Sequence, residues 1–159
     1  GILTLIVTVT IFSMSFMIKG QTGEFILDLR FWGTDAEDVQ ALFAALRENG
    51  AMGLYQKLRT LDLLYPAVYG SFGFFWLLIL FGKSKLKWVT ALPVMSAGFD
   101  YAENHLIHKL MDMTPEQQAE IVGRMTMFTQ IKYTTITLSL VFLGIGLWRH
   151  FKGGRNAVG

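Results

Sequence analysis

The sequence predicts an all-α integral membrane protein, an antiparallel bundle of four transmembrane helices with an exoplasmic amphipathic helix between the first two. Of the 159 residues, 52% are hydrophobic and only 16% are charged, whereas about 25% of the residues of a soluble domain are charged. The apolar residues form long uncharged runs, and basic residues gather directly after these runs. We expect a single domain over residues 1–159, because no linker or internal repeat divides the chain.

The lengths of the apolar segments set the expected spans. A helix needs roughly 20 residues to cross about 30 Å of hydrocarbon. Ile2–Ile18 is an uncharged run of 17 residues and Leu63–Gly82 one of 20 residues, whereas two later segments reach this length only with ionisable groups inside them. A large buried-core soluble protein is the alternative, but Trp and Tyr near the ends of the segments favour a membrane. The predicted spans are approximately 2–19, 61–82, 88–111 and 125–148.

The distribution of charge predicts the orientation in the membrane. Segments 83–87 and 149–159 together hold six Lys or Arg residues and no acid, whereas residues 19–62 hold five basic and seven acidic residues. Cytoplasmic loops are enriched in Lys and Arg. We therefore expect both termini in the cytoplasm, residues 19–62 outside, and a location in a bacterial inner membrane.

The segment between the first two spans predicts an amphipathic helix over about residues 35–49. Thr34-Asp-Ala-Glu37 has the form of a capping box, and Gly50 is suited to end the helix. This helix is expected on the membrane surface, as a lid over the bundle, or as a packed connection without a role in access. Phe25–Trp32 is expected at the interface, extended or as a short turn. The residues of one helical face are Val39, Leu42, Phe43 and Leu46.

The fourth helix is predicted to begin outside the hydrocarbon. Thr114 is suited to the N-cap, Pro115 to the first helical position, and Gln117 completes a capping box. From there to Trp148 the helix would have about 35 residues and a length of roughly 50 Å. Its first turns should therefore project beyond the lipid.

The third span carries the residues that suggest a function. Asp100, Glu103, Asn104 and His108 fall within about 140° of one helical face, with Tyr101 at its edge. Counted from Trp88 at 1.5 Å per residue, the two acids lie roughly 18 and 22 Å from the cytoplasmic edge. A charged side chain at this depth costs several kcal/mol unless it is paired or faces a cavity.

A basic partner for these acids is predicted on the fourth helix. Lys132 lies roughly 24 Å from the same edge, and the short connection 112–114 makes the third and fourth helices neighbours. We expect Lys132 to pair with Glu103 or Asp100, in a polar pocket open to the outer side. The alternative is a purely structural ion network that fixes helix register. Arg59 and Asp62 are expected at the interface, partly solvated.

Two sets of residues describe the predicted pocket. The candidates for acid–base catalysis are Asp100, Glu103, Lys132 and His108. The candidates for substrate binding are Asn104, Tyr101, Tyr65, Tyr69, Asp62, Gln130 and Tyr133.

Such a pocket favours binding or transformation of a lipophilic small molecule by acid–base chemistry. The class would be a lipid, an isoprenoid or a sterol-like compound, and whether the protein is an enzyme stays open. One alternative is a proton-coupled transporter or channel subunit that works as an oligomer. Another is a non-catalytic accessory or receptor subunit of a membrane complex.

Composition also limits the partners and cofactors. The expected partners are the lipid bilayer, a lipophilic small molecule and either further copies of the chain or a larger membrane complex. A net charge of +2 without aromatic residues among the basic ones argues against nucleic acid. No cofactor is predicted, since nucleotide-binding glycine motifs are absent. A metal site is a less favoured variant, because the spacing of its candidate ligands is poor: Asp62, Asp100, Glu103, His105 and His108.

Overall fold

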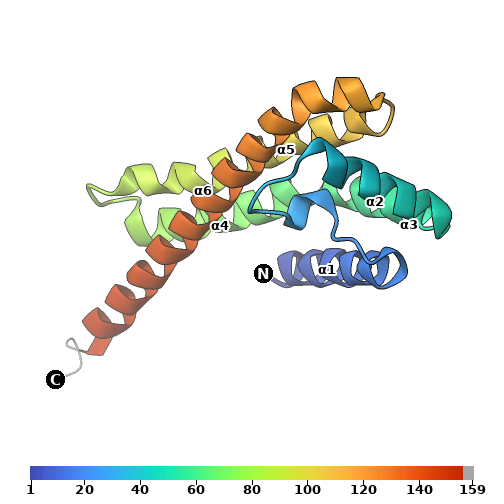
Figure 1. Cartoon of the computed structure of the whole chain (residues 1–159). Coiled ribbons are helices and arrows are strands. Elements are labelled where there is room, and N and C mark those ends of the chain that lie inside the picture. The colour runs from blue at the N-terminus through green and yellow to red at the C-terminus, as the bar shows by residue number, and fades with distance from the viewer. Residues whose placement is uncertain (156–159) are drawn as a thin grey trace.

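The computed structural model describes residues 1–155, and every regular element in this part of the chain is helical (Figure 1). The predicted all-α class is therefore confirmed. In chain order the elements are α1 (Ile2–Thr22), the short 3₁₀ helix η1 (Leu27–Leu29), α2 (Ala36–Glu48), α3 (Met52–Asp62), α4 (Tyr65–Phe81), the 3₁₀ helix η2 (Lys87–Ala91), α5 (Leu92–Leu110) and α6 (Pro115–Arg155).

Three helical stretches in the described chain are long and apolar enough to cross a membrane: Ile2–Thr22, Met52–Phe81 and Pro115–Lys152. The helix α5 has 19 residues, which corresponds to about 28 Å. It also carries Asp100, Glu103 and Lys109. Its length permits a crossing, but its composition does not identify it as a span.

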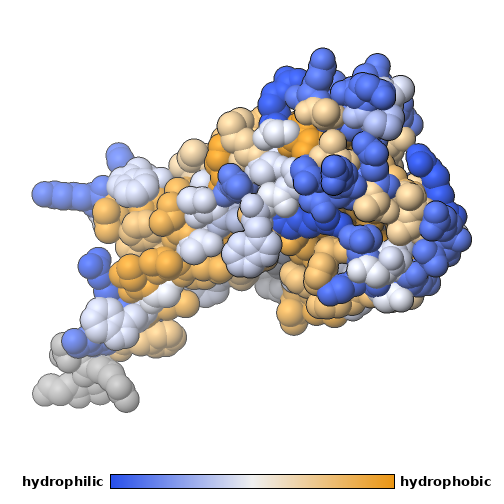
Figure 2. Space-filling view, in the orientation of Figure 1, coloured by the Kyte–Doolittle hydropathy of each residue, from blue (hydrophilic) through white to orange (hydrophobic). Residues whose placement is uncertain are grey.

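The helices run back and forth between two ends of the molecule (Figure 1). The η2 turn and the far end of α6 lie toward one end, and the α2–α3 and α5–α6 turns lie at the other, while α1 begins near the middle of the molecule and runs toward the α2–α3 end. The helix α5 packs against α4 and α6, and α1 packs against α3 and α4. Figure 2 shows hydrophilic residues over the α2–α3 end and near the tips of the opposite end, with mostly hydrophobic residues between them.

The predicted second span, 61–82, overlaps the apolar stretch Met52–Phe81, which a turn divides into two helices. Residues 52–62 form a separate helix, α3, and a turn at Leu63–Leu64 precedes α4. Pro66 lies in the first turn of α4. A proline is tolerated there because the N–H groups of a first turn have no partner within the helix. The third segment is divided too, since η2 precedes α5 and Pro93 lies in the first turn of α5.

The capping residue of α2 is Asp35, so the predicted capping box at Thr34 and Glu37 is wrong. The Asp38 N–H donates to Asp35 Oδ1 at 2.8 Å, and the Asp35 N–H donates to Asp38 Oδ2 at 3.2 Å. The backbone N–H and C=O of Thr34 instead bond the Thr126 hydroxyl of α6. A carboxylate cap also suits the positive end of the helix dipole. The apolar face of α2 is buried, as the periodicity predicts.

The segment after α1 turns inward. Gly23 ends α1 with φ 77°, in the left-handed region that favours glycine. The chain then forms η1, and Ile26, Leu27 and Asp28 are buried. The short turn predicted within Phe25–Trp32 is confirmed by η1, and its first side chains face the protein interior. Two apolar side chains next to Asp28 favour burial of this turn.

The last helix begins as predicted and continues further. Pro115 is its first residue, and the Thr114 N–H donates to Gln117 Oε1 at 3.1 Å. The helix has 41 residues and passes Trp148, the predicted end. Figure 1 shows α6 diverging from the other helices toward its C-terminal end.

Candidate functional site

Three ionisable side chains meet between α5 and α6. Lys132 Nζ lies 3.4 Å from Asp100 Oδ1 and forms an ion pair with Glu103. The other oxygen of Glu103 accepts a hydrogen bond from the Thr129 hydroxyl. Glu103 is completely buried, and Asp100 and Lys132 are nearly so. The structure thus brings together these residues at the equal depth that residue counting gives.

Asp100 is also held from α4. The Tyr69 hydroxyl donates to Asp100 Oδ2 at 3.0 Å. The Ser96 hydroxyl lies 3.2 Å from the Tyr69 oxygen and donates to the Lys132 carbonyl at 3.3 Å. Ser96 was not among the predicted site residues, although it lies one turn before Asp100 on the same helix. Both oxygens of Asp100 therefore have partners.

A second group of buried polar residues centres on Arg59. Its Nη1 donates to Asp28 Oδ2 and, at 3.1 Å, to Asp62 Oδ2, while its Nη2 donates to Asn104 Oδ1. Arg59 is 8% exposed and Asp62 is 7% exposed. The predicted partly solvated positions of these two residues are therefore wrong. They are buried because η1 and α5 cover this face of α3 and supply partners for both charges.

Asp28 is a site residue that the sequence analysis missed. It is 8% exposed, and the Tyr133 hydroxyl of α6 donates to its backbone carbonyl at 2.8 Å. The one available signal was an acid between apolar neighbours, Leu27 and Leu29, in a segment with few charges. That signal does not reveal Arg59 as the partner, because 30 residues, including the whole of α2, separate the two in the chain.

A cavity of about 220 Å³ lies beside these groups. We call it the charged cavity, because it is lined by Asp28, Asp62, Asp100 and Lys132 together with Tyr65, Tyr133 and apolar side chains of α1 and η1. Its walls come from almost every long helix of the fold. The predicted pocket on the third and fourth helices is therefore enclosed by more of the chain than expected.

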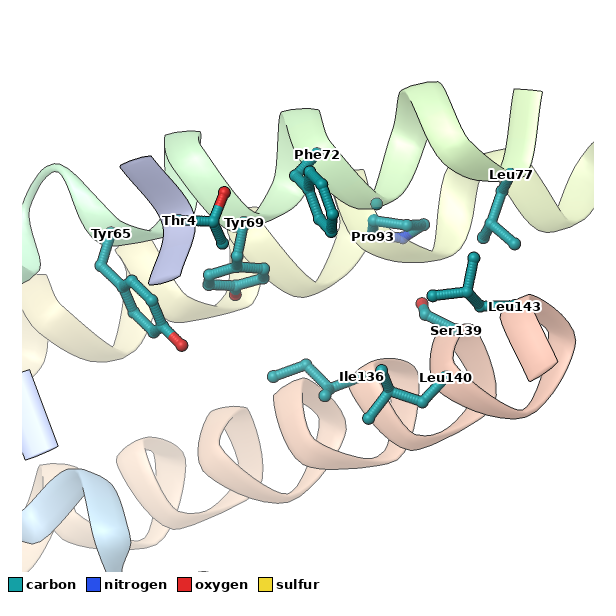
Figure 3. Close-up of a pocket in the computed structure, with 11 residues that line it drawn as sticks. Thr4, Tyr65, Tyr69, Phe72, Leu77, Pro93, Ile136, Ser139, Leu140 and Leu143 are labelled. Carbon is teal, nitrogen blue, oxygen red and sulfur yellow. The ribbon is translucent and has the colours of Figure 1, made fainter. Parts of the chain in front are cut away.

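A second cavity, of about 290 Å³, continues along α4 toward the η2 end. We call it the apolar cavity. In Figure 3, Phe72, Leu77 and Pro93 face Ile136, Leu140 and Leu143 of α6 across this space. Tyr65 and Ile136 line both cavities. The two cavities thus adjoin at these residues.

The predicted site residues His108, Tyr101, Asn104 and Gln130 do not line either cavity. His108 and Tyr101 are exposed and line a separate groove between α3 and α5, with Asn104 and Arg59 at its base. The side chain of Gln130 is exposed on α6. The polar residues of α5 are divided between two sites because this helix contacts α3 on one side and α6 on another. One part of its polar arc faces α6, and the other faces α3.

This arrangement places a carboxylate and an ammonium in one small, largely apolar space. Asp100 and Lys132 both line the charged cavity and lie within ion-pairing distance, so a proton could be exchanged between them or with a bound molecule. Within residues 1–155, no three His, Asp or Glu side chains form a group that could hold a metal ion. Comparison of the chain with protein-family models, with curated proteins and with solved structures finds no match.

Proposed function

We propose that the chain is a four-span membrane protein that binds a lipophilic small molecule with a polar end. In this proposal α5 joins the three apolar spans as a fourth. Two buried acids on α5, Asp100 and Glu103, have Lys132 as a common partner. Pairing of this kind lowers the cost of placing charges within a membrane.

The arrangement of the helices supports an orientation with both termini in the cytoplasm, as in a bacterial inner membrane. The basic turn between α4 and α5 contains Lys83, Lys85 and Lys87. This turn and the far end of α6 lie toward the same end of the molecule, and α1 begins on the side facing that end and runs away from it (Figure 1). An enrichment of basic residues at one end is typical of the cytoplasmic side.

The observation that carries the proposed function is the contact between the two cavities at Tyr65 and Ile136. The charged cavity offers carboxylates and an ammonium, whereas the apolar cavity has no charged side chain among the described residues that line it and offers apolar side chains with a few hydroxyl groups among them. Binding sites for small molecules commonly combine an apolar lining with a few polar groups that orient the ligand. A molecule with one polar end and one apolar part would match both cavities at once.

Filling the apolar cavity tests the proposal. The protein is purified in a mild detergent, and bound molecules are detected by native mass spectrometry. Ser139→Phe places a ring in the cavity that Ser139 lines and should lower occupancy about tenfold, because the ligand then loses buried apolar area. Thr137→Phe on the exposed face of the same helix is the matched control.

Equal occupancy in the two variants would contradict the location of the site. The absence of any bound lipophilic molecule, even after incubation with a lipid extract, would contradict the function itself.

Acid–base catalysis on the bound molecule is a second candidate. Asp100 and Lys132 both line the charged cavity, so both could contact a ligand. Glu103 is completely buried and does not belong to the lining of either cavity, so it would position Lys132 rather than contact a substrate. Asp100→Asn should then abolish conversion of a bound molecule while the molecule still binds.

Ion transport is less well supported by the arrangement. The apolar cavity leads from Tyr69 toward the η2 end, and beyond Tyr69 the only hydroxyl residue that lines it among the described residues of α4, α5 and α6 is Ser139. Ions require polar groups or water along their path. A path through this part of the molecule would offer few such groups.

A further inference from the structure

We infer that the polar end of the bound molecule is a cation that donates hydrogen bonds, of the class of a long-chain primary amine. This inference rests on the proposed function and specifies its ligand. It is carried by the balance of charge around the charged cavity and by an acceptor atom that has no partner.

The buried groups around the charged cavity carry more negative than positive charge. Asp28, Asp62 and Asp100 line it together with a single cation, Lys132. Lys132 also pairs with Glu103, which does not line the cavity. A second buried cation, Arg59, pairs with both Asp28 and Asp62. Four carboxylates thus face two cations. Attraction between unlike charges is strong where water is scarce, so a cationic ligand would be favoured.

Hydrogen bonding favours the same ligand class. The Oδ1 atom of Asp28 is buried and has no hydrogen-bond partner within the described part of the chain, whereas its Oδ2 atom accepts from Arg59. A buried carboxylate oxygen without a donor is unfavourable. An ammonium group supplies three donors and no acceptor.

Other head groups fit this lining less well. The Tyr133 hydroxyl already donates to the Asp28 carbonyl, and the Lys132 ammonium already pairs with Asp100 and Glu103. A carboxylate or phosphate head would bring further acceptors and negative charge to a space that already has an excess of both. A hydroxyl head could donate one hydrogen bond, but it would leave the charge unbalanced.

Three probes with the same alkyl chain separate these head groups. Dodecylamine, dodecanol and dodecanoate are titrated onto the full chain in nanodiscs of neutral phosphatidylcholine, and empty nanodiscs give the background. At pH 7 the amine is protonated and the acid is ionised. We expect the amine to bind about tenfold more tightly than the alcohol, since charge-assisted hydrogen bonds are roughly twice as strong as neutral ones. The acid should bind most weakly.

The outcomes separate this inference from the proposed function. Alcohol or acid binding as tightly as the amine would overturn the cationic head group and leave the lipophilic site in place. A lack of specific binding by all three probes would overturn both.

A substitution of Asp28 tests whether this residue binds the ammonium group of the ligand. Asp28→Asn should lower the affinity for dodecylamine about tenfold, because a charge-assisted bond is lost, and should leave dodecanol binding unchanged. Asp112→Asn, at an exposed position in the α5–α6 turn, removes the same charge as the control. Unchanged amine affinity in Asp28→Asn would overturn the role of this residue. If that variant fails to fold, the three probes on the unmodified chain still decide the head group.

Discussion

The two ends of the molecule are held together by different interactions. At the α2–α3 end, α2, α3 and η1 cover a continuous apolar core, and the buried charges beside it are paired. At the η2 end the buried core is small and consists of Leu77, Phe81, Val89 and Leu92. Many large apolar side chains at this end are exposed, for example Ile79, Leu140 and Trp148. Surfaces of this kind are suited to contact with lipid.

The difference indicates a division of roles along the helices. Buried ion pairs need exact geometry and so specify how the helices meet at one end. Looser packing at the other end leaves space between α4 and α6, which is where the apolar cavity lies (Figure 3). If this interpretation is correct, substitutions that break the buried ion pairs should lower stability, and those that fill the apolar cavity should weaken binding.

The largest loss of stability is expected for Lys132→Met. The substitution removes the ammonium that pairs with Asp100 and Glu103 and leaves these two buried carboxylates without it. Breaking a buried ion pair from one side typically costs about 3–5 kcal/mol. The free energy of unfolding, measured by denaturant titration in detergent micelles, should fall by this amount.

Two further variants check the cause. Lys109→Met at an exposed position of α5 should have little effect. Glu103→Gln added to Lys132→Met should restore part of the loss, because one unpaired charge is removed. A double variant that is less stable than Lys132→Met alone would argue against the pairing as the cause.

A smaller loss is expected for Arg59→Lys. The guanidinium reaches Asp28 and Asp62 from Nη1 and Asn104 from Nη2, and a single ammonium cannot reproduce this fork. Loss of one hydrogen bond to a charged group corresponds to about 1.5–3 kcal/mol. The same unfolding measurement applies, with Arg47→Lys on the exposed side of α2 as the control. Equal stability of both variants would show that charge alone, without the fork, suffices here.

The contact between α4 and α5 offers a test of packing in the looser half. A Cβ atom at Gly73 would lie 2.9 Å from both Cβ and Cγ of Pro93, which belongs to a rigid ring. We expect Gly73→Ala to cost about 1–3 kcal/mol, the usual range for overpacking. Gly98→Ala has open space around its new methyl group and should be neutral or slightly stabilising, because alanine favours helices more than glycine does. Little change in Gly73→Ala would indicate that the two helices can separate at low cost.

The features predicted correctly depend on local pattern or on simple helix geometry. Three of the four predicted spans overlap helices that are long and apolar enough to cross a membrane, and the predicted pairing of Lys132 with Asp100 and Glu103 is confirmed. The features that could not be predicted from the sequence are contacts that depend on the path of the chain in space. The position of Asp28 depends on the turn at η1, and the separation of His108 from Lys132 depends on which neighbour each part of α5 faces. No periodicity encodes these contacts.

The smallest loss of stability is expected for a substitution at the N-cap of α2, where the local sequence pattern allows two capping residues. Thr34 and Asp35 are both suited to an N-cap, and both are followed three residues later by an acid, Glu37 and Asp38. The structure selects Asp35, since the backbone of Thr34 is held by Thr126 of α6. Asp35→Ala should therefore cost about 1 kcal/mol, the typical value of a lost cap, whereas Thr34→Ala should cost almost nothing. The two are compared by thermal unfolding with circular dichroism. The reverse order would mean that the local pattern, rather than the contact with α6, determines where the helix begins.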